Sequence, residues 1–101
     1  MNQIIDFYWI GEVNSKDSTG QVVTTKTYDL CVGMLKSVYE KEFFQAAQAG
    51  IRPSFVIETF SMNYGGQKYI KFDDKEYSIY RTYKKGTDRI ELYCQGRVGN
   101  G

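Results

Sequence analysis

The chain of 101 residues contains no histidine, one proline and two cysteines, and its apolar residues form no long run. Histidine is the usual general base of enzymes and the commonest metal ligand, so its absence removes the most frequent catalytic and metal-binding designs. No apolar stretch approaches the ~20 residues of a membrane-spanning helix. The formal net charge of +1 is far from the strongly basic balance that is typical of polyanion-binding proteins.

The sequence also lacks the short motifs that carry common chemistry. It has no G-x-S-x-G, no H-E-x-x-H and no glycine-rich phosphate loop. The pair Gly65-Gly66 is too short to hold a pyrophosphate and indicates a hairpin turn. The pair Asp73-Asp74 lacks the further carboxylates of a calcium loop and also indicates a turn. We therefore expect a protein that is not an enzyme and that uses no metal or other cofactor.

The two cysteines, Cys31 and Cys94, lie in apolar, strand-like contexts. Neither has a neighbour that would activate a thiol, and two distant cysteines without further ligands make no zinc site. We expect two buried, reduced thiols, with a disulfide as the alternative. The first residues lack the basic and apolar regions of a signal peptide, so we expect folding in a reducing cytosol.

Aromatic side chains, in contrast, are abundant, at 16% of the residues with nine tyrosines. Runs rich in tyrosine and β-branched residues alternate with polar turns, which is typical of antiparallel strands with one solvated face. The pattern predicts seven strands, at residues 4–10, 22–28, 30–36, 54–60, 69–72, 77–83 and 89–94. Asp29 is expected to separate the second strand from the third, and Gly33 to mark a bulge or a close backbone approach.

Alternation along the last two strands predicts which side chains share a face. In the sixth strand one face is expected to carry Tyr77, Ile79, Arg81 and Tyr83. In the seventh strand Ile90, Leu92 and Cys94 are expected on one face, and Arg89, Glu91 and Tyr93 on the other.

One helix is predicted in the middle of the chain. Ser37 and Glu40 fit a capping box, and good helix formers continue to residue 49. Gly50 is expected to end the helix in a left-handed conformation, and Pro53 prevents it from restarting.

The predicted helix carries an apolar stripe of Tyr39, Phe43 and Ala46 or Ala47. A helix of about 11 residues is only marginally stable in water, so this stripe is expected to pack on the sheet or on a partner. Phe44 lies off the stripe and indicates a contact surface.

These elements predict one mainly-β domain over residues 1–101. A small β-barrel of about six to seven antiparallel strands, or a sandwich, with one short α-helix in a mid-chain insertion, fits them better than an α/β fold.

Charge is distributed unevenly along the chain. Residues 1–66 carry five basic and seven acidic residues, and residues 67–101 carry eight and five. Four lysines in the second part lie among aromatic residues and are candidates for facing DNA: Lys68, Lys71, Lys84 and Lys85. Basic residues interleaved with aromatics stack on bases and neutralise phosphates, so a small nucleic-acid-binding β-barrel is one functional hypothesis.

The order of several segments resembles the head-closure family of tailed bacteriophages and prophages, also called head–tail adaptor or stopper proteins. The segment 37–53 contains Ser-x-x-x-x-Glu-Phe-x-x-Ala and precedes the aromatic strand 55–60. A turn at Tyr64 follows, and then Tyr-x-Ile-x-Arg-x-Tyr at residues 77–83. The resemblance covers roughly residues 30–94. At the middle turn the family often has Asp-Tyr, where this chain has Asn63-Tyr64.

The resemblance implies a structural protein of the phage neck. Such proteins form a six-fold or twelve-fold homo-oligomeric ring below the portal-side adaptor, close the channel that holds the packaged DNA, and present the attachment site for the tail or tail-terminator protein. The protein would be assembled in the bacterial cytoplasm and reside in the virion, with no membrane partner. A tail-completion protein is a further alternative.

The resemblance also implies a role for the inserted segment 37–50, which would lie toward the channel or a neighbouring subunit. The residues expected to make ring, channel or partner contacts are Ser37, Tyr39, Glu40, Glu42, Phe44, Gln45, Gln48 and Arg52.

Overall fold

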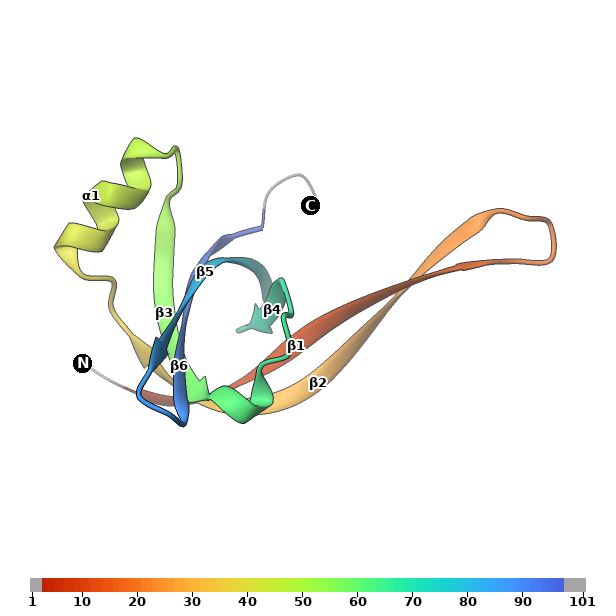
Figure 1. Ribbon diagram of the computed structural model, residues 1–101. Helices are drawn as coiled ribbons and strands as arrows, with labels where there is room; N and C mark the ends of the chain where they lie inside the picture. Colours follow the sequence, from red (N-terminus) through yellow and green to blue (C-terminus); the bar gives the residue numbers. More distant parts are fainter. Residues whose placement is uncertain (1–2, 98–101) are drawn as a thin grey trace.

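The computed structural model describes residues 3–97 and shows six antiparallel strands in a sheet that closes on itself, with one short helix in mid-chain (Figure 1). The order around the closed sheet is β1-β2-β3-β6-β5-β4. The predicted mainly-β class is therefore confirmed. The elements are β1 (Gln3–Lys16), β2 (Val22–Lys36), α1 (Glu40–Gln48), β3 (Pro53–Phe60), the 3-10 turn η1 (Ser61–Asn63), β4 (Tyr69–Phe72), β5 (Lys75–Lys85) and β6 (Arg89–Gly96).

The core lies inside the closed sheet and takes alternate side chains from the strands. It is built from Ile5, Phe7, Trp9, Cys31, Ile57, Ile70, Ile90, Leu92 and Cys94. Both cysteines are free and buried, as expected. Burial raises the pKa of the Cys94 thiol to about 12, so this group stays protonated and behaves as a small apolar side chain.

Gly33 permits a close approach between β2 and the core. A Cβ on this residue would lie 2.6 Å from Cγ2 of Ile57 and 3.0 Å from a ring carbon of Phe7. The predicted close backbone approach is confirmed, and the pairing of β1 with β2 continues through this position without a bulge.

The first two strands are longer than the sequence pattern predicts. Asp29 does not interrupt β2, because the register of β1 with β2 runs unbroken from Gln3 and Leu35 to Lys16 and Val22, and Asp29 faces Trp9 within it. The prediction of a separate third strand is therefore wrong. The turn between the two strands covers only residues 17–21, and the Asp17 carboxylate accepts hydrogen bonds there from the backbone amides of Thr19 and Gln21.

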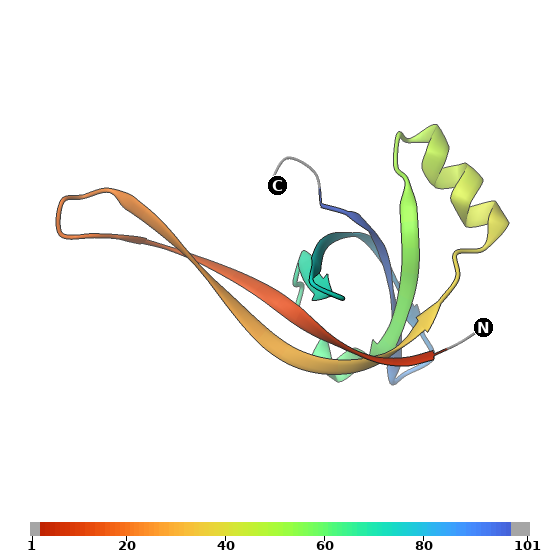
Figure 2. The same ribbon diagram turned by 180° about the vertical axis from the view of Figure 1, so that it is seen from behind.

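The outer half of the β1–β2 hairpin projects beyond the closed sheet as a long arm (Figures 1 and 2). We call residues 11–27 the arm. Across residues 3–97, the arm strands have backbone partners only in each other, and residues 12–25 are exposed. The arm accounts for the elongated shape of the molecule, which measures 50 × 30 × 24 Å.

The last two strands follow the predicted alternation only in part. In β6, Ile90, Leu92 and Cys94 all lie in the core, which confirms the prediction for that strand. In β5 the register shifts between Ile79 and Arg81, so the prediction that one face continues along the strand is wrong. Within the described residues, no helix combines the length and apolar character needed to cross a membrane.

Candidate assembly interface

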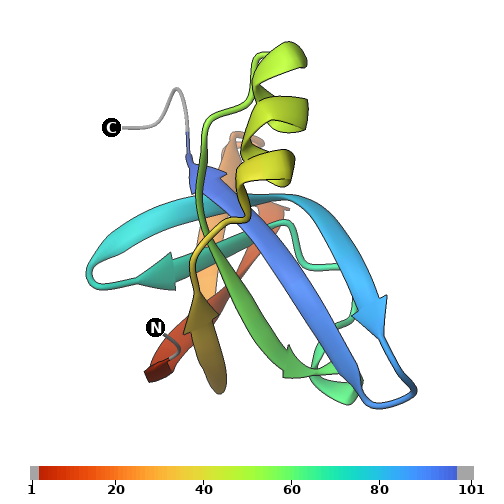
Figure 3. The ribbon, with the colours of Figure 1, turned by 90° about the vertical axis from the view of Figure 1, so that its left-hand side faces the viewer.

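Helix α1 lies outside the closed sheet, next to the start of β3 (Figure 3). Its N-cap is Tyr39, in an extended conformation and with no side-chain capping bond in the described structure, so the predicted capping box of Ser37 and Glu40 is wrong. The C-terminal end is as predicted. Gly50 has a φ of 78°, and the amides of Gly50 and Ile51 donate to the carbonyls of Ala47 and Ala46.

The side of α1 that faces the sheet is polar. Its buried residues are Glu42 and Ala46. The Glu42 carboxylate accepts from the Tyr80 hydroxyl at 2.9 Å and from Nε of Arg81 at 3.2 Å, and its other oxygen pairs with the second nitrogen of the Arg81 guanidinium. Arg81 and then Tyr80 hold the pKa of Glu42 below its ordinary value. An ion pair therefore attaches the helix to the sheet.

The bulge in β5 explains how two consecutive residues reach the same carboxylate. Ile79 pairs with Cys94 and Arg81 pairs with Tyr93, which leaves Tyr80 as the extra residue on the bulged strand. A bulge re-aims side chains that would otherwise alternate between faces. Both Tyr80 and Arg81 thus point outward to α1.

The ion pair continues into a polar network on the outer surface of β2, β3, β5 and β6. The Arg81 guanidinium stacks on the Tyr93 ring at 3.8 Å, and the Tyr93 hydroxyl donates to Glu91 at 3.0 Å. Lys36 donates to Glu91 at 3.2 Å and also to Glu58. Burial, and then the bond to Glu91, raises the pKa of Tyr93 to about 12. This outer network joins four strands and the helix.

At the far end of the outer network, Arg89 donates to Glu58 at 2.9 Å and Lys85 lies 3.4 Å from the same carboxylate. Lys36 is the main cause of the lowered pKa of Glu58, and Glu58 raises the pKa of Lys36 in turn. In the part of the chain that the structure describes, every buried side-chain polar atom has a hydrogen-bond partner. A network whose polar groups are all hydrogen-bonded holds α1 rigidly against the sheet.

The opposite side of α1 exposes its large aromatic residues. Tyr39, Phe43 and Phe44 are 64%, 48% and 62% exposed, and Ala47 beside them is exposed as well. We call these four residues the helix patch. The predicted stripe of Tyr39, Phe43 and Ala47 exists, but it faces solvent, because the Glu42–Arg81 pair holds the other side of the helix against the sheet. Phe44 is exposed, as a contact residue has to be.

The remaining candidate contact residues lie around this helix. The exposed ones are Ser37, Glu40, Gln45, Gln48 and Arg52. Glu42 differs from them, because it is buried in the ion pair with Arg81 and is not part of the exposed surface.

The four lysines expected to face DNA do not form one patch. Lys71 on β4 lies 5.1 Å from the centroid of the Tyr28 ring, and Lys68 precedes the same strand. Lys71 pairs with Glu76 near the start of β5, whereas Lys84 and Lys85 lie at its end. The eight residues from Glu76 to Lys84 span ~27 Å along an extended strand.

The carboxylates near these lysines reduce their local positive charge. Lys71 shares a shallow surface hollow of ≈ 320 Å³ with Asp6, Asp73 and Asp74, and Lys85 pairs with Glu58. Among the described residues, no group of three histidine, cysteine or acidic side chains is placed to hold a metal ion.

The sequence pattern did not predict the arm or its anchor. Arg97 donates to Glu76 at 2.9 Å and to Glu12 at 3.1 Å, and its guanidinium lies 3.7 Å from the centroid of the Tyr69 ring. Glu76 also accepts from Lys26 at 3.0 Å. This cluster fixes the root of the arm to β4 and β5. The signal in the sequence was the run of β-branched residues at 22–25, which the structure pairs with residues 13–16.

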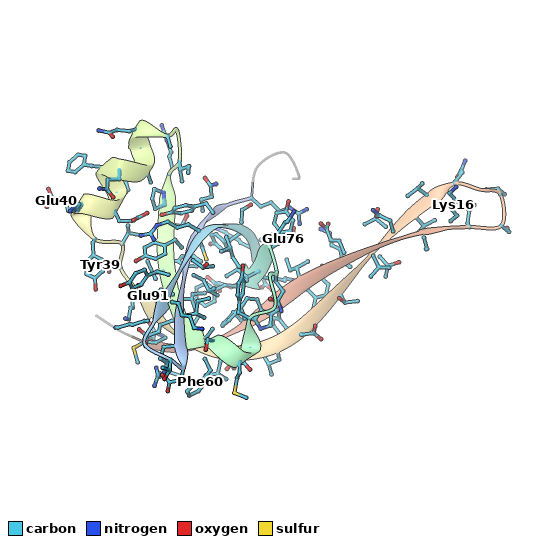
Figure 4. The ribbon with its side chains drawn as sticks, in the orientation of Figure 1. Lys16, Tyr39, Glu40, Phe60, Glu76 and Glu91 are labelled. Carbon is cyan, nitrogen blue, oxygen red and sulfur yellow. The ribbon has the colours of Figure 1, made fainter. Side chains whose placement is uncertain are left out.

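Two exposed surfaces, the helix patch and the arm, are each attached by a buried or half-buried ion-pair cluster. Exposed apolar side chains also occur elsewhere, at Ile4, Leu30, Val32, Phe60 and Met62. Figure 4 labels Tyr39 and Glu40 at the helix and Lys16 near the end of the arm, on opposite sides of the molecule. Searches of protein-family models, curated proteins and solved structures find no match to the chain.

Proposed function

We propose that this protein is a structural head–tail connector of a tailed bacteriophage or prophage. In this proposal it forms a homo-oligomeric ring below the portal-side adaptor, closes the DNA channel and provides the attachment site for the tail. The resemblance of residues 30–94 to head-closure proteins is the starting point, and the closed six-stranded sheet with a mid-chain helical insertion is the fold that this resemblance implies.

The observation that carries the proposal is the outward orientation of the helix patch. Aromatic side chains are enriched in protein interfaces, and exposed apolar groups gathered in one place on a soluble protein mark an interaction site. In this protein the exposed aromatic residues lie on a helix that the Glu42–Arg81 ion pair holds against the sheet, in the segment that the resemblance assigns to subunit or channel contacts. A buried stripe would instead have made α1 a part of the core.

A nucleic-acid-binding barrel receives less support. Its candidate lysines are divided between two distant places, and two of them lie beside carboxylates. Phosphate binding requires several positive charges along one continuous track.

Co-assembly tests the proposal. The purified protein is mixed with the portal and adaptor proteins encoded by the same phage or prophage genome, and the products are weighed by native mass spectrometry. We expect a complex that contains a ring of this chain only when the portal and adaptor are both present. Repeated failure to co-assemble, together with salt-sensitive binding of single-stranded DNA in a fluorescence titration, would transfer support to the nucleic-acid alternative.

A further inference from the structure

The outer side of the closed sheet exposes apolar residues where β1, β2 and the end of β3 meet. Alternation places Ile4 of β1 and Leu30 and Val32 of β2 on this outer side, because core residues alternate with them along both strands. Phe60 lies beside them, since it lines one surface hollow with Ile4 and Val32 and a second hollow with Leu30 and Val32. The exposed fractions of Ile4, Leu30, Val32 and Phe60 are 64%, 63%, 52% and 48%. We call these four residues the sheet patch.

The sheet patch contains the middle of a row that crosses four strands. The register pairs Asp6 on β1 with Val32 on β2, and Phe60 on β3 with Arg89 on β6. Val32 and Phe60 connect the two pairs, because the hydroxyl of Thr59, the residue before Phe60, donates to the Val32 carbonyl at 2.9 Å. The row therefore reads acid, apolar, apolar, base across the outer surface.

The Asp6 end of the row is negative. Asp6 is exposed and has no ion-pair partner within residues 3–97. It shares a surface hollow with Asp73, Asp74 and Lys71, so three carboxylates lie there with one cation. This end of the row therefore favours a basic group from a second molecule.

The Arg89 end of the row is positive. The Arg89 guanidinium donates from one nitrogen to Glu58, and its side chain stays 41% exposed. Three cations surround the two carboxylates in this part of the outer network: Lys36, Lys85 and Arg89 around Glu58 and Glu91. Asp88 in the adjacent turn is offset by Lys84, so one positive charge remains in excess. This end therefore favours an acidic group from a second molecule.

We propose that the sheet patch is the contact surface of a two-fold dimer of this chain. A row that reads acid, apolar, apolar, base is its own complement when a two-fold axis passes between the two apolar residues, because each end then meets the opposite end of the other copy. In this dimer Val32 packs on Phe60 of the second copy. Asp6 pairs with Arg89 of the second copy, and the symmetry repeats this pair, so the charges name a second copy as the occupant.

The size of the surface agrees with a weak dimer. Packed sheet faces lie ~10 Å apart, a distance that an aspartate and an extended arginine bridge together. The sheet patch with the exposed Tyr8 and Asp6 presents roughly 600 Å², so the dimer buries roughly 1,200 Å² in total, which is the lower limit of specific interfaces. Such small contacts are transient, so we expect monomers at micromolar concentration and dimers toward millimolar concentration.

This dimer uses a surface that is separate from the helix patch. Helix α1 lies next to the start of β3, whereas the sheet patch lies at the end of that strand, at Phe60 (Figure 4). A ring contact through α1 thus stays possible in the dimer, and the inference does not rest on the proposed function.

Sedimentation equilibrium of the full chain from about 10 µM to 1 mM tests the dimer, since a contact with a Kd of ~1 mM is already populated at the upper end. Val32→Lys and Val22→Lys form a matched pair, because both valines lie on β2 and both are exposed, but Val22 lies on the arm. We expect the unmodified chain to dimerise reversibly. Val32→Lys should raise the Kd at least about tenfold, and Val22→Lys should change it by less than about twofold.

Charge reversal tests the two-fold arrangement. Asp6→Arg and Arg89→Asp should each raise the Kd by about two- to thirtyfold, because each variant turns both ion pairs of its own dimer into repulsions. A 1:1 mixture of the two variants should restore the dimer, since the introduced arginine then meets the introduced aspartate and the native Arg89 meets the native Asp6. Glu40→Arg on α1 is the control and should leave the Kd unchanged.

Four results would overturn the dimer. They are a single monomeric mass up to 1 mM, equal effects of Val32→Lys and Val22→Lys, a mixture of the charge variants that stays monomeric, and growth beyond the dimer. If Arg89→Asp does not fold, because Arg89 also binds Glu58, the unmodified chain is titrated over the same range by NMR. Amide shifts must then move at residues 4–8 and 30–34 and stay constant at 22–25 and 40–48, and movement at the arm or at α1 refutes the contact.

The outcome is distinguishable from that of the proposed function. Loss of the dimer leaves co-assembly with portal and adaptor untouched, and a dimer that never co-assembles retains this contact and removes the function.

Discussion

Replacing Glu42 by glutamine should detach helix α1 from the sheet while leaving the closed sheet folded. The substitution keeps the size of the side chain and removes the charge that binds Arg81 and accepts from Tyr80. A hydrogen bond to a charged group contributes ~1.5–3 kcal/mol when both partners are buried. The Arg81 side chain is 41% exposed and regains water when released, so we expect a net loss of only about 1–2 kcal/mol.

Thermal unfolding measures this loss. A domain of about 100 residues changes its Tm by roughly 4–8 °C per kcal/mol, so Glu42→Gln should lower the Tm by about 4–16 °C. Hydrogen exchange should rise most in α1 and least in β3 and β6, since the helix is attached mainly through this carboxylate. Glu40→Gln, on the exposed side of the same helix, is the matched control and should leave both quantities unchanged.

The stability of the protein should be more sensitive to the loss of Arg81 than to the loss of the Glu42 charge. Arg81→Met leaves the buried Glu42 carboxylate without its cation, which costs more than leaving a half-exposed guanidinium in water. We therefore expect Arg81→Met to destabilise the protein more than Glu42→Gln, and the double variant to be less destabilised than the sum of the two single variants.

The effect of pH has a definite sign. The pKa of Glu42 in the folded protein lies below its ordinary value of 4.5, so the stabilisation is fully present above that value and is lost as the pH falls through the lower, folded pKa. The difference in stability between wild type and Glu42→Gln should therefore be largest near pH 7 and shrink in acid. An unchanged Tm together with unchanged exchange in α1 would refute the attachment of the helix by this ion pair.

Three further substitutions probe other parts of the molecule. Phe44→Ala should change the monomer Tm by less than about 4 °C, because an exposed side chain contributes within ~0.5 kcal/mol, yet it should weaken assembly in native mass spectrometry; a large drop in monomer Tm would place the Phe44 side chain in the core. Gly33→Ala should destabilise by about 1–3 kcal/mol in urea unfolding, because the added Cβ meets Ile57 at 2.6 Å, and wild-type stability would show that the core yields. Arg97→Gln should raise hydrogen exchange at residues 11–16 and 22–27 more than in β3, and uniform exchange would contradict the anchoring of the arm.

The sequence pattern predicted the fold class and β6 because both depend on local alternation. Ile90, Leu92 and Cys94 reach the core without any irregularity in their strand. In β5 the bulge at Tyr80 changes the face, and nothing in the alternation of that segment marks the extra residue. Asp29 was expected to interrupt its strand and the first strand to end at residue 10, but a continuous cross-strand register extends both strands. Local propensity is a weak guide where pairing across the sheet decides the structure.

The candidate interface was predictable to a similar extent. The apolar stripe on α1 followed from residue spacing, but its exposure did not, since Tyr39 and Phe43 are exposed along with Phe44. Which side of the helix is buried depends on Arg81, about forty residues further along the chain, and no local pattern contains that information. For the same reason Glu42 was expected at a partner and is instead bound within its own chain.

The central claim is that the protein is a ring-forming part of a phage neck. Electron cryomicroscopy of virions produced from the genome that encodes the chain tests this proposal most directly. The account predicts a closed ring of this six-stranded fold between the adaptor and the tail, around the DNA channel, with α1 at a subunit boundary. Particles whose neck density is filled by other proteins, with this chain absent or located elsewhere, would contradict it.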